Sequence, residues 1–346
     1  MNFKATALNR IVTSSVAAAA IVLSPVFAAV AQAETLVGAG ASFPAPLYQR
    51  YAREVRKTHK NLQVNYTACG SSCGIRNFVK GTVDFGGSDA AMKDSDIAKV
   101  SRGTILVPTA GGAVSVVYNL PGVNNLKLSR KVLPLIFAGR ITKWNDARIR
   151  KDNPGVRLPN RRITPVVRAD GSGTTFIFTN HLSTISGYFK GRVGTSKKPR
   201  WAFRGARKGK GNSGVAALVK RTRGGIGYVN YSYARLNKIK SARVQNRSGQ
   251  FVAPSLRAAN TGLSSVKFPA NYRVFVGDSS KGYPIVGLTW MMVYKKYPSA
   301  AKAASVKKWV NWVMTKGQSF NGKLLYTSIP TSVRRRVIRQ VNSQVK

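Results

Sequence analysis

The sequence has 346 residues, of which 57 are Lys or Arg and 10 are Asp or Glu, so the formal net charge is +47. Hydrophobic residues make up 43% of the chain, including 14 Phe and 5 Trp, which is enough to build a core and excludes a disordered basic tail. The length corresponds to about two domains. The excess of positive charge predicts an anionic partner, but composition does not distinguish nucleic acid, an acidic membrane surface, a polyanion and a small anion.

The first 33 residues have the pattern of a secretory signal peptide. Two basic residues precede a short apolar run at 16–23, and the small residues at 31–33 are typical of a signal peptidase site before Glu34. A membrane anchor is the alternative, but Pro25 and the shortness of the run argue against a span of roughly 20 residues. We therefore expect an exported, periplasmic protein that begins at Glu34 and keeps a net charge of +45, because both basic residues leave with the signal.

From residue 34 onwards, short strand patterns alternate with helical ones. The patterns predict, in order, a strand at 35–37, a helix at 44–57, a strand at 64–66, a helix at 75–79 and a strand at 83–85. This succession is typical of an α/β protein with a largely parallel sheet.

Two continuous apolar β runs, at 111–118 and 285–294, are suited to buried strands or to crossovers between domains. The block between them is large enough to form a domain of its own. We expect residues 34–113 and 286–346 to form one discontinuous lobe and residues 114–285 to form a second lobe, with a cleft between them. Two domains in series are the alternative.

Cys69 and Cys73 are the only cysteines, in the sequence CGSSC. An oxidising compartment favours a disulfide between them, provided that their Cα atoms lie within about 7 Å of each other. A pair of buried thiols is the alternative. Because the chain has only two His, these two thiols are too few for a zinc site, and we expect no metal.

Three segments place glycines and a hydroxyl residue directly before a helical pattern. They are Gly38–Phe43, Gly70–Ser72 and Asp170–Thr175. Glycine permits close backbone approach, Ser and Thr cap the helix, and the free N–H groups of a helix start attract an anion. One such turn is usually no more than a helix cap, but three in one chain favour an anion site.

Two acidic side chains and one arginine extend this pattern. Asp89 lies in GGSDA, and Arg168 and Asp170 lie in RADGSGT. Arg168 is able to donate a bidentate pair to a tetrahedral anion, with Asp170 orienting it. An ionised Asp89 only accepts hydrogen bonds, so its presence at an anion site requires a ligand that carries a proton, as phosphate does near neutral pH and sulfate does not. A helix cap after a strand is the alternative role of Asp89.

Six stretches of the chain form a recognisable series: GAGASFPAPLY, NYTACGSSCG, TVDFGGSDA, LIFAGRITKWND, VVRADGSGTTFIFT and GGIGYVNYSYA. In this order they closely resemble the periplasmic phosphate-binding proteins of phosphate-specific ABC transporters, over nearly the whole mature chain. The resemblance implies a type II, two-lobed Venus-flytrap fold of α/β lobes with two crossover strands and a ligand cleft. It also implies a monomer without a cofactor that binds one hydrogen phosphate or dihydrogen phosphate without catalysis and delivers it to a membrane permease.

The resemblance also implies which residues contact phosphate. Carried over position by position, the ligand contacts are Ser42, Phe43, Ser71, Asp89, Arg168, Ser172, Gly173 and Thr174. Asp89 takes the role of acceptor for the phosphate proton, and Asp170 stands next to the site as the partner of Arg168. The sequence departs from the family at ACGSSCG, where relatives often have glycines in place of the two cysteines, so the effect of a bridge around Ser71 is left open.

Two other function classes remain as alternatives. The segment from Lys190 to Lys210 holds nine basic residues with interleaved aromatic residues, a pattern typical of a surface for single-stranded nucleic acid or another polyanion such as heparin. No nucleic-acid module signature accompanies it, so we expect no specific nucleic-acid partner. A secreted phosphatase is the third class, but GSGTT lacks the GxSxG form of a nucleophile elbow and the acids show no spacing for a metal pair.

Overall fold

The computed structural model describes residues 34–346, and the predicted signal peptide at 1–33 lies outside this range. The strands are β1 (Glu34–Gly40), β2 (Leu62–Ala68), β3 (Phe85–Ser88), β4 (Thr104–Asn119), β5 (Lys127–Leu128), β6 (Thr164–Arg168), β7 (Arg207–Gly209), β8 (Gly225–Asn230), β9 (Lys240–Ser241), β10 (Arg243–Gln245), β11 (Phe251–Val252) and β12 (Val286–Tyr294). The helices are α1 (Ala45–Thr58), α2 (Ser71–Lys80), α3 (Asp94–Ile97), α4 (Val132–Phe137), α5 (Ala147–Asp152), α6 (Gly173–Ile185), α7 (Gly187–Arg192), α8 (Gly211–Arg221), α9 (Tyr231–Leu236), α10 (Leu256–Leu263), α11 (Ala300–Met314), η1 (Lys316–Phe320), η2 (Gly322–Leu324) and α12 (Thr331–Gln344).

The main sheet has the strand order β2-β1-β3-β12-β4-β8-β6-β7, with β9 paired to β4. Strand β1 is parallel to β2 and β3, and β6 is parallel to β7 and β8. The pairs that involve β4 or β12 are antiparallel. The structure therefore confirms the α/β class, but the sheet is mixed rather than largely parallel, because the two long strands that link its parallel groups run against their neighbours.

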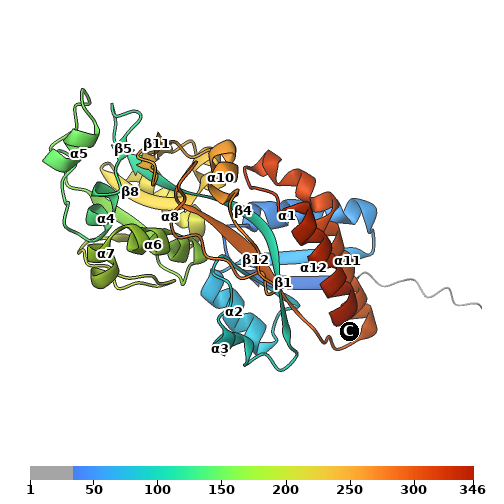
Figure 1. Ribbon diagram of the computed structural model, residues 1–346. Coiled ribbons are helices and arrows are strands. Elements are labelled where there is room, and N and C mark those ends of the chain that lie inside the picture. The colour runs from blue at the N-terminus through green and yellow to red at the C-terminus, as the bar shows by residue number, and fades with distance from the viewer. Residues whose placement is uncertain (1–33) are drawn as a thin grey trace, which may run out of the picture. The chain divides into compact units, whose positions relative to one another are not determined.

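Strand β4 changes partner along its length. Residues 104–113 pair with β12 and residues 114–119 pair with β8. Figure 1 shows β4 and β12 lying side by side between the two groups of strands and helices. Residues 105–118 are buried throughout, which explains why this part of the sequence is continuously apolar instead of alternating.

The helix and strand positions near the N-terminus follow the predicted order with shifted boundaries. Helix α1 covers the predicted 44–57 closely, whereas α2 begins at Ser71, four residues before the predicted start. Within GSSCG, only Gly70 takes a positive φ, of +98°, and the chain enters the helix directly after it. Strand β3 begins where the predicted strand ends.

The aromatic residues in and beside the basic segment 190–210 pack against the protein core. Phe189, just before it, is fully buried, and the Trp201 ring lies 6.0 Å from that of Phe137. Phe203 in turn stacks on Trp201 at 5.4 Å. Trp201 and Phe203 are half-buried and pack against the core, so they are not the fully exposed rings of a stacking platform for single-stranded nucleic acid. No helix within residues 34–346 is both long and apolar enough to cross a bilayer.

Candidate ligand-binding site

The residues that the sequence analysis singled out come together at the starts of three helices. Ser42 and Phe43 lie between β1 and α1, Ser71 begins α2, and Gly173 and Thr174 begin α6. Asp89 directly follows β3, and Arg168 ends β6. All of these residues and Ser172 are buried. Several helix starts therefore meet in one small buried region, an arrangement that favours an anion.

The Ser71 hydroxyl joins two segments that are far apart in the sequence. Its oxygen accepts the backbone N–H of Asp89 at 3.2 Å and the backbone N–H of Gly173 at 2.9 Å. A hydroxyl has two lone pairs and one proton. With both lone pairs engaged by N–H groups, the Ser71 hydroxyl is left to act as a donor, which suits an anionic acceptor.

Arg168 is held by Asp170, as the sequence suggested. The arginine Nε donates to Asp170 Oδ1 at 2.9 Å and Nη2 donates to Oδ2, while Nη1 is directed to the Thr174 hydroxyl at 3.5 Å. The Gly211 N–H also donates to Asp170 Oδ1, at 2.9 Å. Burial alone would raise the pKa of Asp170, but the hydrogen bonds and charge of Arg168 outweigh it and lower that pKa. Asp170 thus stays ionised and aims the guanidinium.

Asp89 is a buried acceptor inside the site. Its carboxylate accepts the Thr289 hydroxyl at 2.8 Å and the Thr174 hydroxyl at 3.4 Å. Because these partners are hydroxyls and not helix N–H groups, Asp89 is not the helix cap that the sequence left open. Burial raises the pKa of Asp89 to about 7, although Thr289, Arg168 and Thr174 oppose this by favouring the ionised form. Burial thus makes Asp89 easier to protonate than an ordinary aspartate.

The turn before α1 is fixed by three tyrosines from distant parts of the chain. Their hydroxyls donate to three successive backbone carbonyls, at distances of 2.6 to 2.8 Å: Tyr66 to Ala41, Tyr233 to Ser42 and Tyr326 to Phe43. The Phe43 ring packs edge-on against Tyr326, with ring centres 5.8 Å apart. Phe43 therefore serves the core through its side chain, and only its backbone is available to a ligand.

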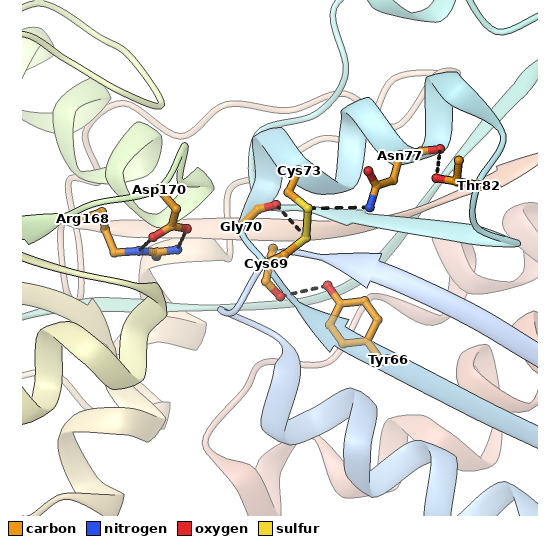
Figure 2. The surroundings of a disulfide bond; sticks show 9 residues. Tyr66, Cys69, Gly70, Cys73, Asn77, Thr82, Arg168 and Asp170 are labelled. Atoms are coloured by element: carbon orange, nitrogen blue, oxygen red, sulfur yellow. Dashed lines mark hydrogen bonds and ion pairs between the residues drawn. A yellow bond between two sulfur atoms is a disulfide. The ribbon is translucent and has the colours of Figure 1, made fainter.

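A disulfide joins Cys69 to Cys73, with the two Cα atoms 5.8 Å apart, which confirms the predicted bridge. The N–H groups of Cys69 and Gly70 both donate to the carbonyl of Gly40, at 2.9 and 2.8 Å. Figure 2 shows the bridge at the first turn of α2, with Arg168 and Asp170 facing it from another part of the chain. A Cβ on Gly70 would lie 2.3 Å from Asp170 Oδ2, so only glycine fits at this approach.

Ser172 caps α6 through its side chain. Its hydroxyl oxygen accepts the N–H of Thr175 at 3.0 Å, and its own N–H donates to the carbonyl of Lys197 at 2.9 Å. Glycine is required at the next position, because a Cβ on Gly173 would lie 2.5 Å from Ser71 Oγ and 2.7 Å from the Asp89 nitrogen. Ser172 therefore sets the direction of α6, and Gly173 allows its first turn to reach Ser71 and Asp89.

The sequence analysis missed Asn212, Thr289 and the three tyrosines. Asn212 donates to the hydroxyls of Ser42 and Thr174. A signal for it was present, because Gly211–Gly214, the first turn of α8, combines glycines with a hydroxyl residue as the three recognised segments do. Thr289 had no such signal, since it lies inside the continuous apolar run of β12.

The arrangement combines many neutral donors and one arginine with a single carboxylate acceptor. Such a set matches a tetrahedral oxyanion that retains a proton. Within residues 34–346, no group of three or more His, Cys, Asp or Glu residues is placed to hold a metal ion.

Comparison with known sequences identifies relatives along almost the whole chain. The family model described as the PBP superfamily domain matches residues 26–316. The phosphate-binding protein PstS of Pasteurella multocida is 36% identical, over 94% of this chain and 95% of that protein. PstS of Haemophilus influenzae is 38% identical, over 91% of this chain and 95% of that protein. PstS of Methanocaldococcus jannaschii is also 38% identical, over 81% of this chain and 78% of that protein.

Solved structures share the fold. A human phosphate-binding apolipoprotein superposes with a TM-score of 0.74 at 22% identity, over 88% of this chain and 94% of that chain. A phosphate-binding protein of Stenotrophomonas maltophilia superposes with a TM-score of 0.71 at 19% identity, over 89% and 94% of the two chains. Together with the match to the PBP superfamily model, these similarities confirm the predicted two-lobed periplasmic-binding-protein fold class.

Proposed function

The chain belongs to the PBP superfamily and, within it, to the PstS phosphate-binding proteins, and we propose from this premise that it captures inorganic phosphate and delivers it to an ABC transporter permease. Residues 34–113 with 286–346 form one lobe and residues 114–285 form the other. The two lobes close on the ligand, because a ligand shifts an equilibrium only through contacts that differ between the open and closed states. The chain acts as an exported, periplasmic monomer.

The contacts of Asp89 are the observation that carries the proposal. Each neutral hydroxyl and N–H of the site donates, and Arg168 donates as well, so the oxygens of any tetrahedral anion find partners. In its ionised form, Asp89 is the one group of the site that demands a proton from the ligand. Phosphate carries that proton near neutral pH, whereas sulfate does not, and an ionised carboxylate against sulfate is a buried repulsion. Ser42, Phe43, Ser71, Ser172, Gly173 and Thr174 complete the proposed set of contacts.

The same contacts favour binding without catalysis. A phosphatase with a serine nucleophile needs a base within hydrogen-bond reach of the hydroxyl. The Ser172 hydroxyl accepts the N–H of Thr175 instead, and the buried imidazole of His181 faces the carbonyl of Gly277 at 2.9 Å. We therefore assign Ser172 a binding and capping role. Phosphate release from a generic ester by the pure protein, lost in Ser172→Ala, would overturn this part of the proposal.

Titration calorimetry with inorganic phosphate tests the proposal. We expect the wild-type chain without its signal peptide to bind one phosphate with a micromolar or tighter Kd, and Asp89→Ala to bind it much more weakly. Asp96→Asn is the matched control, because it removes one carboxylate at a partly exposed turn of α3 outside the site. Binding of phosphate that is equally tight in Asp89→Ala and Asp96→Asn would contradict the proposed site, and the absence of phosphate binding by the wild type would contradict the function.

A further inference from the structure

Asn212 occupies the centre of a hydrogen-bond network that neither the family resemblance nor the charge pattern assigns to the site. It is the second residue of α8, and its side chain is fully buried. The N–H of Asn230 donates to its Oδ1 at 2.8 Å. This bond identifies the oxygen of the amide and so directs Nδ2 to the opposite side, where Ser42 and Thr174 lie.

Ser42 receives two hydrogen bonds from this one residue. Its hydroxyl oxygen accepts the Asn212 backbone N–H at 3.0 Å and the Asn212 Nδ2 at 2.9 Å. Both lone pairs of the hydroxyl are then engaged, and the Ser42 proton is all that the side chain has to offer to a further partner. Asn212 thereby makes Ser42 an obligatory donor.

Thr174 is controlled in the same way. Its oxygen accepts Asn212 Nδ2 at 3.1 Å and is approached by Arg168 Nη1 at 3.5 Å. Its proton is directed to Asp89 Oδ2 at 3.4 Å, which is long compared with the 2.5–3.0 Å usual for an O–H to oxygen bond. A proton held so loosely is free to turn to an anion beside Asp89, while the oxygen itself stays engaged by N–H groups.

We infer that Asn212 is a positioning residue of the site: it acts through the hydroxyls of Ser42 and Thr174, fixes both as donors toward the anion, and does not itself touch the ligand. The inference rests on the proposed function. The same amide also links the two proposed lobes, because Ser42 precedes α1 while Asn212 and Thr174 begin α8 and α6. The Asn212 side chain therefore sets the donor direction of both hydroxyls and also adds one contact between the proposed lobes, beside the Ser71–Gly173 contact.

A double-mutant cycle on phosphate affinity tests whether Asn212 acts through Ser42. We expect Asn212→Ala to raise the Kd for inorganic phosphate about tenfold, the equivalent of roughly one hydrogen bond. In a Ser42→Ala background the same substitution is expected to raise the Kd by less than about threefold, because its main target is already gone. An equal factor in both backgrounds, or no effect in either, would overturn the inference.

Asn212→Asp provides a second variant of nearly the same shape, which keeps an oxygen for the Asn230 N–H. The carboxylate accepts where Nδ2 donates, so the hydroxyls of Ser42 and Thr174 turn toward it and away from the anion. Asn311→Asp is the control: it makes the same change of charge on α11, where the amide only donates to Asn342. We expect phosphate affinity to fall at least about tenfold in Asn212→Asp and to stay near the wild-type value in Asn311→Asp.

Thermal melts of each variant without phosphate separate positioning from folding. Positioning predicts a loss of affinity that is larger than the change in ligand-free stability, while a purely structural role predicts the reverse. Wild-type protein that does not bind phosphate would contradict the proposed function. Wild-type protein that binds it, together with Asn212 variants of unchanged affinity, would contradict only the role of Asn212.

Discussion

Gly173→Ala tests whether the closed arrangement of the site is the form that binds phosphate. A Cβ at this position would lie 2.5 Å from Ser71 Oγ, 2.6 Å from Asp89 Cβ and 2.7 Å from the Asp89 nitrogen. Normal carbon contacts are about 3.5–4.0 Å, so the overlap approaches 1 Å, and two of the three atoms belong to or adjoin the backbone of Asp89 and cannot turn aside. Overpacking of this kind costs about 1–3 kcal/mol.

The free-energy cost of this methyl group should lower the affinity for phosphate and leave the stability of the ligand-free protein unchanged. Gly173 lies in one proposed lobe and its contacts lie in the other, so opening of the lobes relieves the clash. We therefore expect calorimetry to show a Kd for phosphate about 5-fold to 150-fold higher, which corresponds to 1–3 kcal/mol. The ligand-free melting temperature should stay near the wild-type value, and the rise that phosphate causes should shrink.

Gly191→Ala is the matched control for this experiment. Gly191 lies in α7, and a Cβ there meets no atom within 4 Å. The substitution should leave phosphate affinity unchanged. Gly173→Ala protein that binds phosphate as tightly as Gly191→Ala would refute the reasoning, because the contact between the start of α6 and Ser71 would then be absent from the binding form.

Three further substitutions probe other parts of the site. Arg168→Lys should weaken phosphate binding by about tenfold to a hundredfold in calorimetry, because a lysine cannot pair with Asp170 and the anion together; unchanged affinity would exclude a bidentate contact. Replacing both Cys69 and Cys73 by Ala should lower the free energy of unfolding in urea by about 2 kcal/mol, because the disulfide no longer removes the closure entropy of a five-residue loop from the unfolded chain. The replacement should also weaken phosphate binding. A reductant should produce both effects in the wild type and neither in the variant. Asp89→Asn should gain stability relative to the wild type as the pH rises from about 5 to about 8 without phosphate. The folded-state pKa of Asp89 is raised from 3.8 to about 7, so the wild type becomes less stable as the buried carboxyl ionises, whereas an asparagine does not ionise. A difference in the free energy of unfolding in urea between variant and wild type that is the same at both pH values would contradict this.

Much of the site could be predicted from sequence because its residues lie in short local motifs. Glycine next to a hydroxyl residue at a helix start has a direct physical meaning, and Arg168 is only two residues from Asp170. Most of these motifs follow the carboxyl ends of β1, β3 and β6. Because β6 belongs to the parallel group that runs opposite to β1 and β3, the motifs of the two groups meet where these carboxyl ends face each other. The disulfide was predictable for the same reason of locality.

The features of the site that could not be predicted depend on contacts between residues that are far apart in the sequence. Tyr66, Tyr233 and Tyr326 look like core aromatics, and only the fold shows that their hydroxyls hold the turn before α1. In the sequence, Thr289 is a single polar residue in an apolar strand, and only the pairing of β12 with β3 places it beside Asp89. The direction of β4 and β12 was also hidden, because a buried strand has the same apolar composition in a parallel and an antiparallel sheet.

The central claim is that a buried carboxylate, Asp89, selects an anion that carries a proton. Calorimetric titration of the same wild-type protein with phosphate and with sulfate at about pH 8, above the raised pKa of Asp89, tests this most directly, because Asp89 is then ionised and hydrogen phosphate still carries a proton. The account predicts tight binding of one phosphate and, by comparison, little or no heat of binding with sulfate. Sulfate that binds as tightly as phosphate would contradict it.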